Sequence, residues 1–232
     1  MSNLNRLSLA LVAALFVLAI ACGGDDKSTA SKDDPAKVLS DAVAAINNVQ
    51  SFHFKLDHEN GSTPMPLNLE LVSAEGDVAV PDRIKAEVRA KAISLNVRLD
   101  VIGIGENTWI TNPFSRRWER LPGAALRDIA DPAALAKALV ESLRDVRIEG
   151  RSEVDGTSNY HLQGNLDSGA LAMALPIAEP GYQASVDLYI AESDSLPRRA
   201  RIGGRLSNAD NENVVRVVEF TRYNESVTIV AP

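Results

Sequence analysis

The sequence predicts an α+β protein built on one long, curled antiparallel β-sheet that carries its helices in the concave face. Two observations support this fold class. From Ser51 onward, apolar and polar residues alternate over most of the chain, which is typical of strands with one face in water. Only two segments have the helical spacing of apolar residues, and no internal repeat or second domain is visible. Because a long antiparallel sheet twists and curls, these few helices are expected to cover its apolar face.

Two helices are predicted, and each begins with the same pair of residues. Asp34-Pro35 and Asp131-Pro132 each place a capping side chain before a proline at the first helical position. Apolar residues then recur at helical spacing, so the helices are expected over residues 35–49 and about 132–145. An apolar, alanine-rich segment at 168–176 is expected to be a short helix or a flap.

The strands before residue 101 show the alternation most clearly. Between residues 84 and 101, the apolar positions change from even to odd numbers at Ala92-Ile93. With no proline or glycine at that point, the phase change predicts a tight hairpin or a bulge near residues 90–93. Later strands are predicted at about 146–154, 158–166, 183–192, 197–207, 213–222 and 225–230.

The N-terminus has the pattern of a secretory signal that ends at a cysteine. One basic residue, Arg6, precedes a fifteen-residue apolar run from Leu7 to Ala21, which is short for a transmembrane helix of roughly 20 residues. Ala19-Ile20-Ala21-Cys22 resembles a bacterial lipobox, in which the cysteine is diacylated and becomes the new N-terminus. The alternatives are an ordinary cleaved signal with a chance cysteine, or an uncleaved anchor.

The net charge and the cysteine count limit which kinds of molecule or metal the chain could bind. The 232 residues carry a formal net charge of −7, which argues against binding to nucleic acid or to anionic lipid headgroups. Cys22 is the one cysteine, so its acylation would leave no thiol for a disulfide or a metal site.

An apolar cavity is the candidate functional site. Aromatic residues make up only 5% of the chain, and small aliphatic side chains that line a wide curl can leave a space for a lipid acyl chain. The alternative is a fully packed core. The candidate cavity residues on strands and the second helix are Phe52, Phe54, Leu56, Ile84, Val88, Leu95, Val97, Leu99, Val101, Leu135, Leu139 and Leu143.

A second set of candidates lies between Gly169 and Pro180-Gly181. Leu171, Met173 and Leu175 could form a mobile flap at the entrance of the cavity, because methionine adapts to varied partners. A short buried helix is the alternative.

No catalytic, metal or cofactor motif is found. Gly103-Ile104-Gly105 lacks the third glycine of a dinucleotide loop, and GxSxG, P-loop and HExxH motifs are absent from the sequence. His53, His58 and His161 are expected at solvent-facing positions and not as metal ligands. Arg116, Arg117 and Arg120 beside Trp118 form a basic patch that could contact a lipid phosphate or be a solvated loop.

Short segments along nearly all of the chain after Cys22 resemble the LppX/LprAFG family of lipoproteins. These segments are Ser51-Phe52-His53-Phe54, Glu75-Gly76-Asp77, Pro81-Asp82-Arg83, Thr111-Asn112-Pro113 with Trp118, Asp187-Leu188-Tyr189-Ile190, Leu196-Pro197-Arg198, and residues 218–229. The resemblance implies a half-barrel like that of LolA and LolB, with helices against its concave face. It also implies an apolar cavity for acylated lipids or glycolipids and a role in carrying them.

Together these observations predict a signal peptide at 1–21, a flexible tether at 22–34 and a single lipid-binding half-barrel domain at 35–232. The expected protein is a monomer held by an acyl anchor, such as palmitate, on the extracytoplasmic face of a bacterial membrane. It would carry lipid or glycolipid across the envelope, with a transport partner and without a cofactor. The alternatives are a tethered structural or interaction module with no lipid cargo, and an enzyme such as a hydrolase of lipid or glycan.

Overall fold

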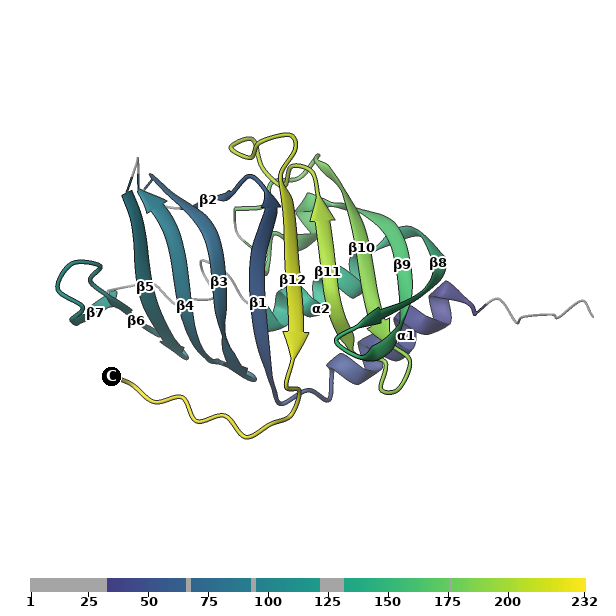
Figure 1. Cartoon of the computed structure of the whole chain (residues 1–232), viewed down its shortest axis with the longest axis horizontal. Coiled ribbons are helices and arrows are strands. Elements are labelled where there is room, and N and C mark those ends of the chain that lie inside the picture. The colour runs from purple at the N-terminus through teal and green to yellow at the C-terminus, as the bar shows by residue number, and fades with distance from the viewer. Residues whose placement is uncertain (1–32, 66–67, 93–94, 122–131, 176) are drawn as a thin grey trace, which may run out of the picture. The chain divides into compact units, whose positions relative to one another are not determined.

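In its described residues, the chain forms an antiparallel sheet of twelve strands with two α-helices over one of its faces (Figure 1). The structure, a computed structural model, describes residues 33–65, 68–92, 95–121, 132–175 and 177–232. The predicted signal peptide, the acylation site Cys22 and the tether up to residue 32 lie outside the described residues and remain predictions.

The strands follow one another across the sheet in the order β7-β6-β5-β4-β3-β1-β12-β11-β10-β9-β8, and β2 pairs with β3. The described strands end at two unpaired edges, β7 and β8, so the sheet is open. This confirms the prediction of an open antiparallel sheet with few helices. The strands are β1 (Ser51–Asn60), β2 (Thr63–Met65), β3 (Leu69–Ala79), β4 (Arg83–Ala92), β5 (Leu95–Ile104), β6 (Asn107–Thr111), β7 (Trp118–Leu121), β8 (Arg144–Val154), β9 (Thr157–Asp167), β10 (Gln183–Ala191), β11 (Pro197–Gly203) and β12 (Val215–Thr221).

The first helix, α1 (Pro35–Ile46), begins where the sequence predicts. The Asp34 carboxylate accepts a hydrogen bond from the backbone N–H of Ala36 at 2.9 Å, which caps the helix beside Pro35. Val38 and Ala42 are buried, so the helix packs through one apolar stripe. It ends at Ile46, three residues before the predicted end.

The second helix, α2 (Pro132–Ser142), ends earlier than expected because β8 already begins at Arg144. The segment predicted as a short helix or flap contains a single turn of 3₁₀-helix, η3 (Ser168–Leu171). In Figure 1, α1 and α2 lie mainly behind the half of the sheet that runs from β12 to β8. Placement of the helices in a concave face remains a prediction.

The structure confirms the predicted hairpin near residues 90–93 but not the last predicted strand. Ala92 of β4 pairs with Leu95 of β5, which confirms the hairpin alternative at the phase change. The strand predicted at 225–230 is wrong, because this terminal segment joins no sheet ladder. Two of its carbonyl groups instead accept bonds from side chains: Ser51 Oγ donates to Glu225 O at 2.5 Å, and Arg83 Nη1 donates to Ile229 O at 3.0 Å.

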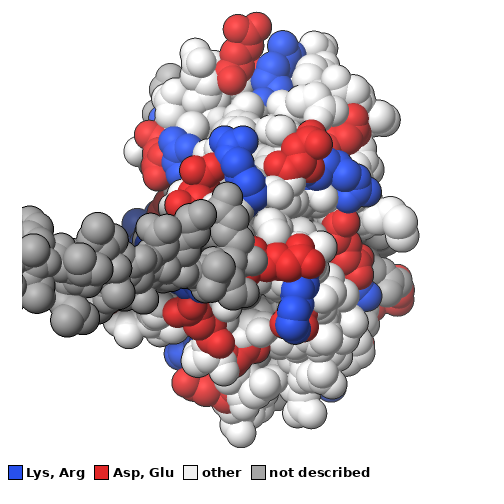
Figure 2. Space-filling view, turned by 90° about the vertical axis from the view of Figure 1, so that its right-hand side faces the viewer, with Lys and Arg blue, Asp and Glu red and all other residues white. Residues whose placement is uncertain are grey.

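The edge strand β8 is protected by its own charges. The charged residues of β8 alternate between basic and acidic. Arg147 forms an ion pair with Glu149, and Arg151 forms ion pairs with Asp33 and Glu192. Figure 2, which faces this end of the molecule, shows positive and negative side chains interspersed. Such charges discourage a second chain from pairing with the open edge.

Gly76 sits where β3 and β4 approach each other closely. A Cβ atom at this position would lie 2.3 Å from the Lys85 carbonyl oxygen and 2.7 Å from Ala86 Cα, both of which are backbone atoms. We expect Gly76→Ala to destabilise the fold by about 2–4 kcal/mol, because a strand would have to shift. Urea unfolding would measure this. The control is Gly203→Ala on β11, where the only atom within 4 Å of the added Cβ would be the side-chain oxygen of Ser185, at 2.9 Å, which can rotate away. An equal effect of the two changes would contradict the prediction.

Candidate functional site

An apolar concavity, here the main cavity, lies against the β3–β6 half of the sheet. Its volume is about 240 Å³. The sheet wall comes from β1, β3, β4, β5, β6, β7, β11 and β12, with Thr63 and Met65 of β2. The lining is completed by Leu135 of α2, by Leu171 and Leu175 at and after η3, and by Leu206 after β11. Apart from Thr63, Thr108 and Arg216, every lining residue is apolar.

Strand register explains why these side chains share one face. Leu56 pairs with Ala74, Ala74 with Val88, and Val88 with Leu99, which makes a row across four strands. The next row runs from Phe54 through Gly76, Ala86 and Val101 to Ile110. Because antiparallel partners project to the same side, the period-two pattern of the sequence becomes a continuous apolar wall.

The structure brings most of the sequence candidates together around the main cavity. Those that line it are Phe54, Leu56, Ile84, Val88, Leu99, Val101, Leu135, Leu171 and Leu175. Leu139 of α2 and Leu143, which follows the helix, are instead buried in the packed core. Leu95 is 52% exposed beside the β4–β5 turn, Val97 is half-buried, and Met173 is 95% exposed. Contact of any of these residues with a lipid remains a prediction.

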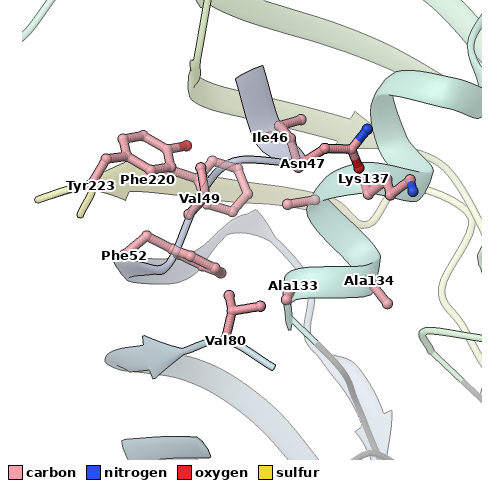
Figure 3. Close-up of a pocket in the computed structure, with 11 residues that line it drawn as sticks. Ile46, Asn47, Val49, Phe52, Val80, Ala133, Ala134, Lys137, Phe220 and Tyr223 are labelled. Carbon is pink, nitrogen blue, oxygen red and sulfur yellow. The ribbon is translucent and has the colours of Figure 1, made fainter. Parts of the chain in front are cut away.

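Phe52 lines a second space, here the side pocket, which also has a volume of about 240 Å³. Figure 3 shows Phe52, Val49 and Val80 on one side of this space and α2, with Ala133 and Ala134, on the other, and Asn47 and Lys137 are its polar lining residues. Phe220 lines both the side pocket and the main cavity. Its ring meets that of Phe52 edge to face, with centroids 6.0 Å apart. The Phe220 side chain therefore separates two apolar spaces.

A buried ion pair forms one part of the main cavity wall. Arg216 Nη2 donates to Asp210 Oδ1 at 2.6 Å, and both side chains are almost fully buried. Arg216 also donates to the Gly204 carbonyl at 3.2 Å and to Thr63 Oγ1 at 2.7 Å. Burial lowers the pKa of Arg216, and the neighbouring Asp210 acts in the opposite direction. The guanidinium group is thus held by the protein's own acceptors.

His58 continues this hydrogen-bonded chain. Its Nδ1 lies 2.8 Å from the Val72 carbonyl, which can only accept, so Nδ1 carries the proton. In the neutral ring, Nε2 then accepts from the Thr63 hydroxyl at 2.8 Å. Burial is the largest cause of a lowered pKa for His58, and the charge of Arg216 also lowers it, while Val72, Asp57 and Asp210 oppose the shift.

A pH dependence of stability follows from the lowered pKa of His58. As pH falls below the ordinary histidine value of 6.5, the unfolded chain takes up a proton that the folded chain resists, so the free energy of unfolding decreases. We expect His58→Asn to lose less stability than the wild type between pH 7 and pH 5, as measured by urea unfolding at each pH. Equal losses in the two proteins would show that His58 does not contribute.

The other two histidines are also more enclosed than the sequence suggests. His53 lies 2.8 Å from Asp77 Oδ1, and His161 stacks on Tyr189 with ring centroids 4.6 Å apart. His53 and His161 alternate with buried apolar residues and are half-buried on the polar face of the sheet. His58 is instead in phase with Phe54 and Leu56, so the prediction of a solvent-facing position is wrong for His58. Within the described ranges, no group of three or more His, Cys, Asp or Glu side chains could hold a metal ion.

The basic patch at the β6–β7 turn is largely occupied by its own chain. Arg116 Nη2 contacts Asp100 Oδ2 at 2.6 Å, and Arg120 donates to Asn107. These contacts agree with the interpretation of the patch as a surface loop. Phe114 on the same turn is 81% exposed.

Sequence reasoning missed the polar members of the main cavity. Arg216 occupies an inward position in the alternation with Val218 and Phe220, and Thr108 is in phase with Ile110. A polar residue in phase with an apolar row was the sequence feature that could have identified these two polar residues of the cavity wall. The partner Asp210 lies in a loop, so no local pattern connects it with Arg216.

No helix in the described part of the chain has the length and hydropathy needed to cross a membrane. A search of curated protein sequences gave no match. Among solved structures, LprF from Mycobacterium bovis is 18% identical and has a TM-score of 0.68, with 85% of this chain and 96% of that chain covered. LppX from Mycobacterium tuberculosis is 18% identical and has a TM-score of 0.58, with 85% and 100% covered. These similarities establish the shared fold.

Family membership rests on a separate comparison. The family model described as LppX_LprAFG lipoprotein matches residues 34–230, which is nearly the whole described domain. This match confirms the resemblance seen in the short segments of the sequence. The chain belongs to the LppX_LprAFG lipoprotein family.

Proposed function

We propose that this lipoprotein binds an acyl chain of a lipid or glycolipid in the main cavity and carries it across the bacterial cell envelope. The observation that carries the proposal is the lining of the main cavity, which is apolar except for three residues. Such a surface favours hydrocarbon over water. Its polar residues Thr63 and Arg216 are already hydrogen-bonded within the protein, so they add little attraction for water.

Binding would be driven by desolvation of the acyl chain. Each square ångström of apolar surface removed from water contributes about 25 cal/mol, so a long chain gains affinity with each buried methylene group. The main cavity and the side pocket each measure about 240 Å³, slightly below the roughly 300–1,000 Å³ of common ligand sites. A movement of Phe220 would join them, and the joined space would accept a longer chain or a second chain.

The anchor and the location follow from the same proposal. Acylation of Cys22 after removal of residues 1–21 would hold the domain on the extracytoplasmic face of the membrane, since two acyl chains anchor a protein stably. The tether would let the monomeric domain reach its source membrane. Release of cargo would need a partner or a second membrane that offers an equally apolar environment.

The proposed role is binding and transport without catalysis. Thr63 and Arg216 on the main cavity wall are held in a hydrogen-bonded chain with His58 and Asp210, and the Thr63 hydroxyl that donates to His58 also accepts from Arg216, which suits a structural role. The lining residues would thus select hydrocarbon and leave its bonds intact.

A vesicle assay tests the carrier function. The protein is added to donor vesicles that contain a fluorescent acylated lipid and to unlabelled acceptor vesicles, and the rate of lipid transfer is measured. We expect the protein to accelerate transfer and a variant with a filled main cavity to lose this effect. Binding without accelerated transfer would limit the function to lipid storage or display.

The interaction-module alternative rests on the exposed side chain of Phe114 at the β6–β7 turn. An exposed aromatic residue beside arginines suits a protein or membrane contact. If the purified protein neither binds nor transfers lipid, this alternative replaces the carrier.

A further inference from the structure

One polar group on the main cavity wall is left without a partner. Thr108 of β6 is fully buried, and its hydroxyl oxygen makes no hydrogen bond to any of the described residues. Across the sheet, Thr108 pairs with Leu121 of β7 on one side and with Gly103 of β5 on the other. Gly103 presents no side chain, so neither neighbour offers a polar side chain to the hydroxyl.

Two other buried threonines in the sheet, Thr111 and Thr63, have hydroxyl groups that are hydrogen-bonded within the protein. Thr111, on the same strand, accepts a hydrogen bond from the Asp100 backbone N–H at 2.8 Å. Thr63, on the main cavity wall, is bonded to Arg216 and His58. Because most buried polar groups are paired, the hydroxyl of Thr108, which has no partner among the described residues, is available to a bound ligand.

A water molecule is a poor candidate for that partner. A buried water needs two to four polar neighbours to offset its removal from bulk solvent. The other polar side chains that line the main cavity, Thr63 and Arg216, already bond to each other and to His58, Gly204 and Asp210. The other described residues of the wall are apolar, so their side chains offer no bond to a water beside Thr108.

We propose that Thr108 donates a hydrogen bond to an oxygen of the bound lipid, namely the carbonyl of the ester or amide group that attaches an acyl chain. This inference rests on the proposed lipid-binding function and adds a specificity to it. The apolar wall would hold the hydrocarbon, and the Thr108 hydroxyl would select chains that carry a carbonyl group over plain hydrocarbon. Discrimination of this kind arises because the buried hydroxyl stays unpaired when the ligand offers no acceptor.

The test compares two ligands in three proteins. Displacement of a fluorescent apolar dye gives the affinities of methyl palmitate and of an alkane of similar length for the wild type, Thr108→Val and Thr108→Ser. We expect Thr108→Val to weaken binding of the ester about 5–10-fold and to leave alkane binding unchanged, while Thr108→Ser keeps the preference for the ester. Equal effects on ester and alkane would overturn the role of Thr108. Failure of the wild type to bind either ligand would instead overturn the proposed function.

Stability of the ligand-free protein provides a second readout with a matched control. Thr108→Val replaces an unpaired hydroxyl with a methyl group of similar size, so the midpoint of thermal unfolding should stay the same or rise. Thr111→Val removes the acceptor of the Asp100 N–H and should lower it. A clear loss of stability in Thr108→Val would mean that the hydroxyl has a partner within the protein, which contradicts the proposal.

Discussion

Replacing Ala74 with phenylalanine is expected to weaken acyl-chain binding by about tenfold or more while the domain stays folded. Ala74 lies in the middle of the main cavity wall, between Leu56 of β1 and Val88 of β4. The new ring would enter space that a ligand otherwise fills, so the protein need not expand to hold it. Dye displacement with a fatty acyl ester measures the loss, and the circular dichroism spectrum checks the fold.

The control for this change is Ala44→Phe on the exposed side of α1, which adds the same ring away from the main cavity. It should leave the affinity as in the wild type. Unchanged affinity in Ala74→Phe would place the lipid elsewhere, for example in the side pocket around Phe52 and Tyr223.

Removing the carboxylate of Asp210 is expected to destabilise the domain by about 3–5 kcal/mol. The change Asp210→Ala leaves the Arg216 charge buried with no counter-charge within bonding distance, and it also removes the acceptor of the Leu206 N–H at 2.7 Å. The free energy of unfolding in urea measures the loss. Asp41→Ala, which breaks the exposed ion pair between Lys37 and Asp41, should leave the free energy of unfolding nearly unchanged.

A double substitution separates two contributions to the free energy of unfolding, namely the cost of burying one unpaired charge and the net stabilisation from the ion pair. In Asp210→Ala with Arg216→Met no charge remains buried, so the loss should be smaller than the sum of the two single losses. Additive losses would show that the two side chains contribute independently. That result would contradict the assignment of the pair as a single unit in the main cavity wall.

The sheet could be predicted from the sequence because each strand carries its own local signal. The alternation around Phe54, Val88 and Leu99 assigned these residues to one face, and the phase change at Ala92 located the hairpin. The strand predicted at 225–230 was wrong for a physical reason. Its alternating residues follow β12, but the segment pairs with no described strand, and the side chains of Ser51 and Arg83 donate to two of its carbonyl groups.

The site could be predicted only in part, because a cavity depends on which strands become neighbours. The pattern that placed Leu139 and Leu143 on one face of a helix does not reveal whether that face meets packed side chains or open space. Met173 shows the same limit, since its apolar neighbours are enclosed while its own side chain is exposed. Pairing of Arg216 with Asp210 depends on a loop, and loops carry no periodic signal.

Native mass spectrometry of the chain, purified without detergent from a lipid-rich bacterial host, tests most directly whether the main cavity holds acyl chains. We expect an added mass that extracts into organic solvent as an acylated lipid and that is absent from Ala74→Phe. A clean ligand-free mass that persists after incubation with several classes of acylated lipid would contradict the proposed function.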